Sequence, residues 1–191
     1  MSDLVSDQEL VARVAAGDRA AFTELMRRHE DMVFAVCLRL MGNRDLALDA
    51  TQETFITLFR KADRFRGESA LSTWLYRVAT NTCFDLQRKA RRRAADPLPE
   101  HHDPADHSTD DALDAIDVRG DIAAALGRIP EEFRAAVILA DAHGLPLADV
   151  AEILGVPVGT VKSRVFRARR LLAEQLGNLN PPPARPRTED A

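Results

Sequence analysis

Apolar side chains recur every three or four residues through most of this 191-residue chain. That spacing places them along one side of an α-helix, and it is interrupted at Gly17-Asp18, Gly42-Asn43 and Arg66-Gly67-Glu68. The pattern therefore predicts four helices in an N-terminal module that covers residues 6–93. The segment Ser6 to Glu9 has the spacing of a capping box, which is typical of a helix start.

A second group of helices follows, beginning with an amphipathic helix from about Pro130 to His143. After it comes a short apolar helix and then a break. Gly155 can take the left-handed position that ends a helix, Pro157 stops its continuation, and Thr160 is placed to cap the next helix. The apolar side of the short helix consists of Leu147, Val150, Ala151 and Leu154. We therefore expect a C-terminal module over residues 119–177, built around a helix-turn-helix.

The second helix of this pair has two distinct sides. An apolar stripe, which we expect to pack inward, is formed by Val161, Val165, Ala168 and Leu172. The opposite side, called the reading face below, carries Lys162, Ser163, Phe166, Arg167 and Arg170. Arginine can donate two hydrogen bonds to guanine, a serine hydroxyl can bind base or phosphate, and a phenylalanine ring can contact a thymine methyl. A merely solvated charged face is the alternative, but no acidic residue lies between 160 and 173 to balance the cations. The pattern thus favours recognition of duplex DNA.

The helix expected near residues 72–93 combines aromatic and basic side chains. Its apolar side is expected to bury Leu75, Val78, Ala79, Thr82 and Leu86. The other side, called the stacking surface below, carries Arg77, Asn81, Phe84, Arg88 and Arg92, with Trp74 at its margin. Aromatic rings stack on unpaired bases while arginines bind phosphates, so this surface suits single-stranded DNA. Trp74 is equally well explained as a core aromatic.

The third helix also shows two faces. The face expected to be buried consists of Leu48, Thr51, Phe55, Leu58, Phe59 and Ala62. A second, mostly polar face consists of Asp49, Gln52, Glu53, Ile56 and Arg60. An isoleucine among polar neighbours indicates a protein interface.

Charge is strongly segregated along the chain, whose net charge is −4. Residues 94–118 contain eight carboxylates, no lysine or arginine, and prolines at 97, 99 and 104, which predicts a flexible acidic linker. About 25 extended residues span roughly 80 Å. Basic segments lie on both sides of this linker, at 88–93 and at 162–170. The tail, residues 178–191, is rich in proline and is expected to be disordered.

Several classes of protein are disfavoured by composition. No apolar run approaches the length of a membrane span and the N-terminus is acidic, so we expect no membrane insertion and a cytoplasmic location. Cys37 and Cys83 are expected to be free thiols. His101, His102 and His107 lie among aspartates, but no spaced ligand pattern supports a metal site, and we expect no metal or cofactor. The chain lacks clustered carboxylates and phosphate-binding glycine loops, so it is not expected to be an enzyme.

Four segments, taken in order, resemble one known family. They are Asp18-Arg-Ala-Ala-Phe22, Asp49-Ala-Thr-Gln-Glu-Thr-Phe55, the run from Phe65 through Asn81, and the run from Pro157 through Arg169. The family is that of the extracytoplasmic-function (ECF) sigma factors, within the sigma-70 family, which are promoter-recognition subunits of bacterial RNA polymerase. The resemblance covers nearly all of the chain outside the linker and the tail.

This resemblance implies a role for each module. Residues 6–93 would be a sigma-2 domain that docks on core polymerase and recognises and melts the minus-10 element, and residues 119–177 a sigma-4 domain that reads the minus-35 element. The minus-35 contacts would be made by the reading face. The minus-10 contacts would be made by Thr57, Lys61, Phe65, Trp74, Arg77, Asn81, Phe84 and Arg88. Thr57 and Lys61 depart from the family pattern, so the resemblance does not fix which base is captured.

The resemblance also implies partners. The docking face, Asp49, Gln52, Glu53 and Ile56, would contact the clamp helices of the polymerase beta-prime subunit, and the beta flap would be a further contact of the polymerase. An anti-sigma protein would silence the factor. The acidic linker would pass through the polymerase cleft, either mimicking nucleic acid or serving only as a soluble tether. The competing interpretation is a stand-alone helix-turn-helix regulator, which would need neither the docking face nor the stacking surface.

Overall fold

The computed structural model describes residues 5–95 and 115–177, and within them all regular structure is helical. The all-α prediction is thereby confirmed. The elements in chain order are α1 (Asp7–Ala15), α2 (Arg19–Met41), α3 (Arg44–Lys61), a 3-10 turn (Ala62–Arg64), α4 (Leu71–Ala95), α5 (Ala115–Arg128), α6 (Glu131–Val137), a π-helical turn (Ile138–Ala142), α7 (Leu147–Leu154) and α8 (Val158–Gly177). The predicted tail and most of the predicted linker lie outside the described residues.

The helices of the N-terminal module begin and end at the expected breaks. Ser6 accepts a hydrogen bond from the Glu9 amide at 3.2 Å, which caps α1. Asp18 caps α2 through the amide groups of Ala20 and Ala21, and Asn43 caps α3 in the same way. Gly42 adopts a φ of 66°, a left-handed conformation that ends α2 at little steric cost.

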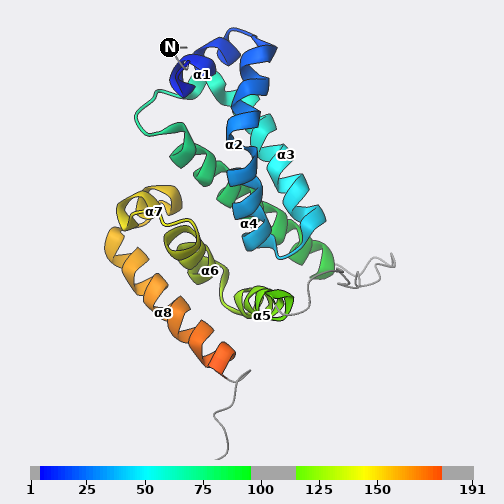
Figure 1. The fold of residues 1–191 in the computed structure, drawn as a ribbon, viewed down its shortest axis with the longest axis vertical. Helices are drawn as coiled ribbons and strands as arrows, with labels where there is room; N and C mark the ends of the chain where they lie inside the picture. Colours follow the sequence, from blue (N-terminus) through cyan, green and yellow to red (C-terminus); the bar gives the residue numbers. More distant parts are fainter. Residues whose placement is uncertain (1–4, 96–114, 178–191) are drawn as a thin grey trace, which may run out of the picture.

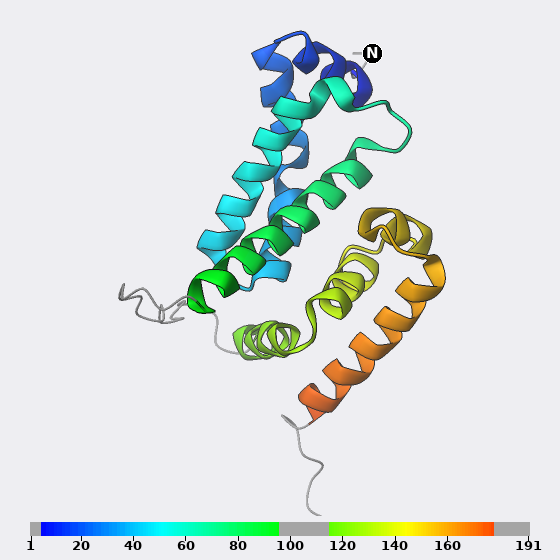
Figure 2. The same ribbon diagram turned by 180° about the vertical axis from the view of Figure 1, so that it is seen from behind.

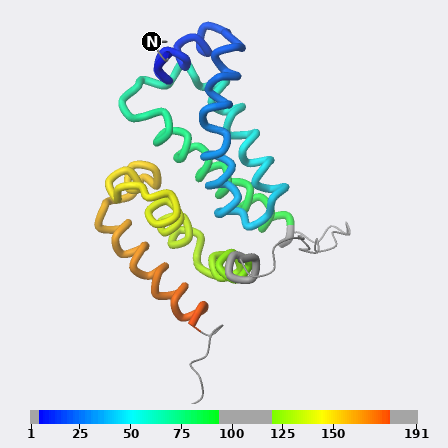
Figure 3. Tube along the Cα trace, viewed as in Figure 1, coloured from blue at the N-terminus to red at the C-terminus, as the bar shows by residue number. Residues whose placement is uncertain are grey.

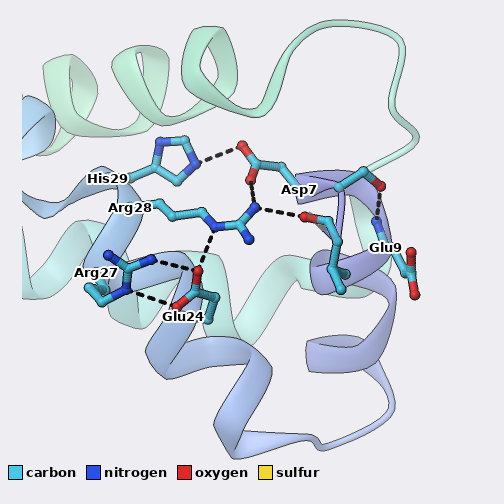
Figure 4. Close-up of polar contacts among 8 residues, drawn as sticks. Asp7, Glu9, Glu24, Arg27, Arg28 and His29 are labelled. Atoms are coloured by element: carbon cyan, nitrogen blue, oxygen red, sulfur yellow. Dashed lines mark hydrogen bonds and ion pairs between the residues drawn. The ribbon is translucent and has the colours of Figure 1, made fainter. Parts of the chain in front are cut away.

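A polar network fastens α1 to α2 (Figure 4). Arg28 donates to the Val5 carbonyl at 2.8 Å and to the Asp7 carboxylate at 3.0 Å, while His29 Nε2 lies 2.8 Å from the other Asp7 oxygen. Arg27 and Arg28 both donate hydrogen bonds to the carboxylate of Glu24, one turn earlier in α2. These hydrogen bonds lower the pKa of Glu24 to about 2. The network fixes how the first helix packs on the second.

The core of the N-terminal module lies where α2, α3 and α4 meet. Leu25, Val33 and Val36 of α2 are completely buried there. The buried side of α3 differs from the predicted one, because Leu48 and Phe59 remain 42% and 47% exposed. Small residues let α3 approach its neighbours closely, so the buried positions of this helix are Ala47, Ala50, Thr54, Phe55 and Leu58. Phe59 instead packs edge-on against Phe22, with ring centroids 5.3 Å apart.

The helix-turn-helix of the C-terminal module consists of α7, the Gly155 turn and α8. Gly155 has a φ of 64°, as the sequence predicts, and the stripe Val161, Val165 and Ala168 is buried. Thr160 is not the cap of α8. That helix begins two residues earlier because the Pro157 carbonyl already accepts the amide hydrogens of Thr160 and Val161 at 2.9 and 3.2 Å.

The boundaries of the predicted linker also shift. Helix α4 continues to Ala95, and α5 begins at Ala115, inside the segment expected to be linker. The reason for α5 is packing, because its Ala125 is buried and Leu126 packs against the apolar cluster formed with α8. Residues 96–114 lie outside the described residues.

The two modules are in contact. In Figures 1 and 2, α4 lies between α2 and α3 on one side and the C-terminal module on the other, and the tube in Figure 3 follows the chain along the same path. Helices α4 and α7 pack together, and one apolar cluster runs from α1 through to α8. Contact on two sides explains why Tyr76, Thr80 and Cys83 are buried, whereas the predicted core residues Val78, Thr82 and Leu86 are only half-buried.

Candidate nucleic-acid interface

Helix α8 presents the reading face to solvent. All five of its residues are exposed, and Phe166 is 68% exposed, the largest value among the exposed large hydrophobic residues of the described chain. The buried stripe on the opposite side holds the helix against α6 and α7, so the exposed side chains extend from a rigid support. An exposed phenylalanine beside arginines has a physical use when it meets base methyls and sugar edges.

The cations of α8 divide into paired and available groups. Arg169 donates two hydrogen bonds to Asp141, at 2.8 and 2.7 Å, and Arg164 lies 3.4 Å from Glu132. Arg170 lies 3.4 Å from Glu174. In the described part of the chain, no ion pair involves Lys162 or Arg167, although Arg167 lies 5.9 Å from the ring of Phe133.

This division changes the interpretation of the basic helix. The balancing acids Asp141 and Glu132 come from the segment before α7, so inspection of α8 alone missed them. Arg169 and Arg164 therefore join α8 to the π-helical turn and to α6. Ser163 donates its hydroxyl hydrogen to the Thr160 carbonyl at 2.9 Å, which leaves its oxygen lone pairs able to accept a hydrogen bond from a base.

The start of α4 and the loop before it form a cavity of 450 Å³. Phe65 and Trp74 meet edge to face there, with ring centroids 6.3 Å apart. Trp74 is half-buried, so it both packs on the core cluster and lines the cavity. The core interpretation and the base-stacking interpretation each describe one side of this residue. The lining residues are Arg64, Phe65, Arg66, Gly67, Glu68, Ser69, Trp74, Arg77 and Glu152. An aromatic pair beside an arginine suits a single unpaired nucleotide.

A second cavity, of 410 Å³, lies further along α4. Its lining brings together Asn81, Phe84, Asp85, Arg88 and Glu131. Six of the residues proposed from the sequence for minus-10 contact are therefore divided between the two cavities. Thr57 and Lys61 lie on α3 and line neither of them.

Acidic side chains from the C-terminal module meet this basic helix, and no pattern within α4 predicts them. Arg77 donates to the Glu152 carboxylate of α7 at 2.9 Å, and Arg91 pairs with Glu131 of α6. No local pattern could have revealed these pairs, because the partners are separated by 75 and 40 positions in the chain.

The docking face lies on the other side of the N-terminal module. Asp49, Gln52, Glu53 and Ile56 are all exposed along α3, and Ile56 is 40% exposed. Leu46, Leu48 and Phe59 add apolar surface to the same helix. Helix α3 lies on the side of the N-terminal module that faces away from α6–α8 (Figures 1 and 2).

The described residues contain no group of three or more side chains arranged to hold a metal ion. The three histidines considered from the sequence lie outside the described ranges. Within those ranges no helix is both long and apolar enough to span a membrane. Cys37 and Cys83 are buried free thiols.

Two family matches cover most of the described chain. Residues 25–93 match sigma-70 region 2, and residues 119–172 match sigma-70 region 4. The chain is similar to the ECF RNA polymerase sigma factor SigM of Mycobacterium tuberculosis, with 39% identity over 92% of this chain and 87% of that protein. It is also similar to the ECF RNA polymerase sigma-E factor of Haemophilus influenzae, with 34% identity over 92% of this chain and 98% of that one.

Solved structures agree with these matches. The sigma factor RpoE, in complex with the anti-sigma factor NepR from Bartonella quintana, aligns with a TM-score of 0.65 and 30% identity, over 81% of this chain and 96% of that one. CnrH in complex with the cytosolic domain of CnrY aligns with a TM-score of 0.65 and 27% identity, over 90% and 97%.

Proposed function

This chain belongs to the ECF sigma factor family, and we propose on that basis that it binds core RNA polymerase, brings it to a restricted set of promoters and helps to open the minus-10 region. The observation that carries the proposal is the presence, in one chain, of three separate surfaces: an exposed reading face on α8, an aromatic and basic surface on α4, and an exposed docking face on α3. A stand-alone regulator has a use for only the first.

The reading face is proposed to enter the major groove at the minus-35 element. Arg167 has no acidic partner among the described residues and its guanidinium is fork-shaped, so it suits a bidentate contact with guanine. Lys162 carries a point charge and suits a phosphate better than a specific base. Phe166 is proposed to lie against a thymine methyl, and Ser163 and Arg170 to complete the contact with base edges and the backbone.

The start of α4 is proposed to hold the unpaired non-template strand of the minus-10 element. The Phe65 and Trp74 rings would stack on a base in the first cavity, and Arg77 would bind an adjacent phosphate. Asn81, Phe84 and Arg88 would hold the next nucleotides along the helix. Thr57 and Lys61 are proposed to contact the strand from α3, outside these two cavities.

The docking face is proposed to contact the beta-prime clamp helices. Its carboxylates would complement a basic surface, while Ile56 and the neighbouring exposed apolar residues would supply the buried centre of the interface. The C-terminal module is proposed to contact the beta flap. The acidic linker is proposed to connect both contacts within the polymerase.

Regulation and location follow from the same assignment. The structurally similar sigma factor RpoE was solved in complex with the anti-sigma factor NepR, and CnrH in complex with the cytosolic domain of CnrY. We propose that an anti-sigma protein also binds this chain. We propose that the chain acts in the cytoplasm, with no cofactor and no catalytic activity of its own, since the chemistry belongs to the polymerase.

A transcription experiment tests the proposal directly. The purified chain is added to core polymerase together with a library of promoter DNA, and the transcripts are sequenced. Initiation that requires both the chain and core polymerase, at sites sharing minus-10 and minus-35 elements, is the expected result. Tight binding to duplex DNA without any activation of core polymerase would instead support the stand-alone regulator.

A further inference from the structure

The C-terminal module meets the stacking surface of α4, where Arg77, Phe84 and Trp74 are half-buried while Asn81, Arg88 and Arg92 remain exposed. Glu152 of α7 reaches into the first cavity and accepts a hydrogen bond from Arg77 at 2.9 Å. Glu131 of α6 lines the second cavity and pairs with Arg91. Glu152 therefore occupies the position proposed for a phosphate beside Arg77, and Glu131 neutralises a further arginine of the same helix.

Apolar contact supports the two ion pairs. Tyr76 is only 6% exposed, and its hydroxyl forms a 3.0 Å hydrogen bond with Nδ1 of His143, across the boundary between the modules. The two rings meet edge to face at 5.2 Å. Arg134 of α6 donates to the Gln87 side chain of α4 at 3.1 Å. The contact thus extends along α4 from residue 76 to residue 91.

This contact is imperfect in one specific respect. Four buried polar atoms near it have no hydrogen-bond partner within the described residues: Arg77 Nε, Thr80 Oγ1, Arg134 Nε and His143 Nε2. A buried polar atom without a partner costs free energy that water would recover if the modules separated. Separation of the modules would therefore relieve the cost of leaving these four atoms without partners.

The other two functional surfaces remain accessible while the modules are closed. The docking face on α3 lies away from the contact, and the reading face on α8 is exposed (Figures 1 and 2). Of the three surfaces, the one proposed to bind the minus-10 strand is the one that the acidic residues of the C-terminal module contact.

We propose that the C-terminal module is an intramolecular competitor of single-stranded DNA, with Glu131 and Glu152 standing in for phosphates on α4. The proposal rests on the assignment of α4 as the strand-binding helix. In the free chain the closed form engages Arg77 and Arg91 of α4, so binding to a single strand is weakened by the fraction of molecules that are closed. Engagement of the exposed docking face by core polymerase comes first, and strand capture follows once the modules separate.

The double variant E131Q/E152Q tests the competition, because it removes both charges with little change of shape. The matched control is E30Q/D31N, which alters net charge equally at two exposed positions of α2 that form no ion pair within the described residues. Affinity is measured by fluorescence anisotropy with a labelled single-stranded DNA decamer of random sequence, and compactness by small-angle X-ray scattering. We expect about tenfold tighter DNA binding and a larger radius of gyration for E131Q/E152Q only.

The outcomes separate this proposal from the function on which it rests. Equal changes of affinity in the two double variants, with unchanged scattering, would overturn the competition while leaving core-dependent transcription intact. Loss of core-dependent transcription by the unaltered chain would overturn the proposed function itself. If circular dichroism shows that the double variant is not folded, E152Q alone replaces it, since the Glu152 side chain is 46% exposed and its loss leaves the core unchanged.

Discussion

The Tyr76 hydroxyl lies 3.0 Å from Nδ1 of His143, which joins α4 to the residue that follows the π-helical turn of the C-terminal module. Burial, with a smaller contribution from the positive charge of Arg39, lowers the pKa of His143 from 6.5 to about 4. The imidazole is therefore neutral in the folded chain at pH 7. Protonation of His143 would disturb its contact with Tyr76, so the packing of the two modules depends on pH through this pair.

Acidification is expected to weaken the folded state through His143. Because the pKa of His143 is lowered on folding, the unfolded chain binds more protons than the folded chain between pH 6.5 and 4. The folded state therefore keeps its full free energy of unfolding above pH 6.5 and loses part of it as the pH falls toward 4. We expect a loss of about 1 kcal/mol between pH 7 and pH 5, reduced by partial solvent exposure. Urea unfolding of the native chain and of His143→Gln at both values measures it. The same pH dependence in both proteins would exclude His143 as the cause.

Replacing Arg167 is expected to weaken recognition of the minus-35 element. The Arg167→Ala variant loses a guanidinium that has no acidic partner among the described residues, and the expected cost is about 1 to 3 kcal/mol of binding free energy. Competition between promoters that differ only in the minus-35 element measures the change. Arg169→Ala is the control, because Arg169 is paired with Asp141, and it is expected to leave sequence preference unchanged. Equal loss of preference in both variants would remove Arg167 from the reading face.

Replacing Asn81 is expected to affect promoter opening rather than initial binding. Asn81 is exposed on α4 within the second cavity, where it can hydrogen-bond an unpaired base. For Asn81→Ala we expect the open complex to be destabilised by about 1 kcal/mol with little change in closed-complex affinity. Permanganate reactivity of unpaired thymines reports opening, and filter binding at low temperature reports the closed complex. Arg167→Ala should show the reverse pattern, and equal losses at both steps would undo this division.

Reversing one charge of the docking face is expected to weaken assembly with the polymerase. Glu53→Lys places a cation among Asp49 and Gln52, and we expect about tenfold weaker binding to core polymerase. Titration of the labelled chain with core polymerase measures it. The matched control is Glu30→Lys, at an exposed position of α2 outside the docking face. An affinity unaffected by Glu53→Lys would exclude this part of α3 from the interface.

Local features of the fold were predictable because their causes are local. Ser6, Asn43 and Gly155 act within a few residues of their own positions, and each begins or ends a helix as expected. The stripe of α8 was equally clear, since a helix buries one side. The prediction that Thr160 caps α8 was wrong because the Pro157 carbonyl already accepts hydrogen bonds from the first turn of this helix.

The pattern of residues along this chain was sufficient to determine most of the helices, the helix-turn-helix and the family to which the chain belongs, because capping, periodicity and motif spacing act over short stretches of sequence. Only the tertiary structure decided what covers α4. The partners of Arg77 and Arg91 come from helices far along the chain, and Tyr76 is buried only because a second module packs on it. Contacts between distant segments depend on how whole surfaces fit, and no periodic pattern within one helix records that fit.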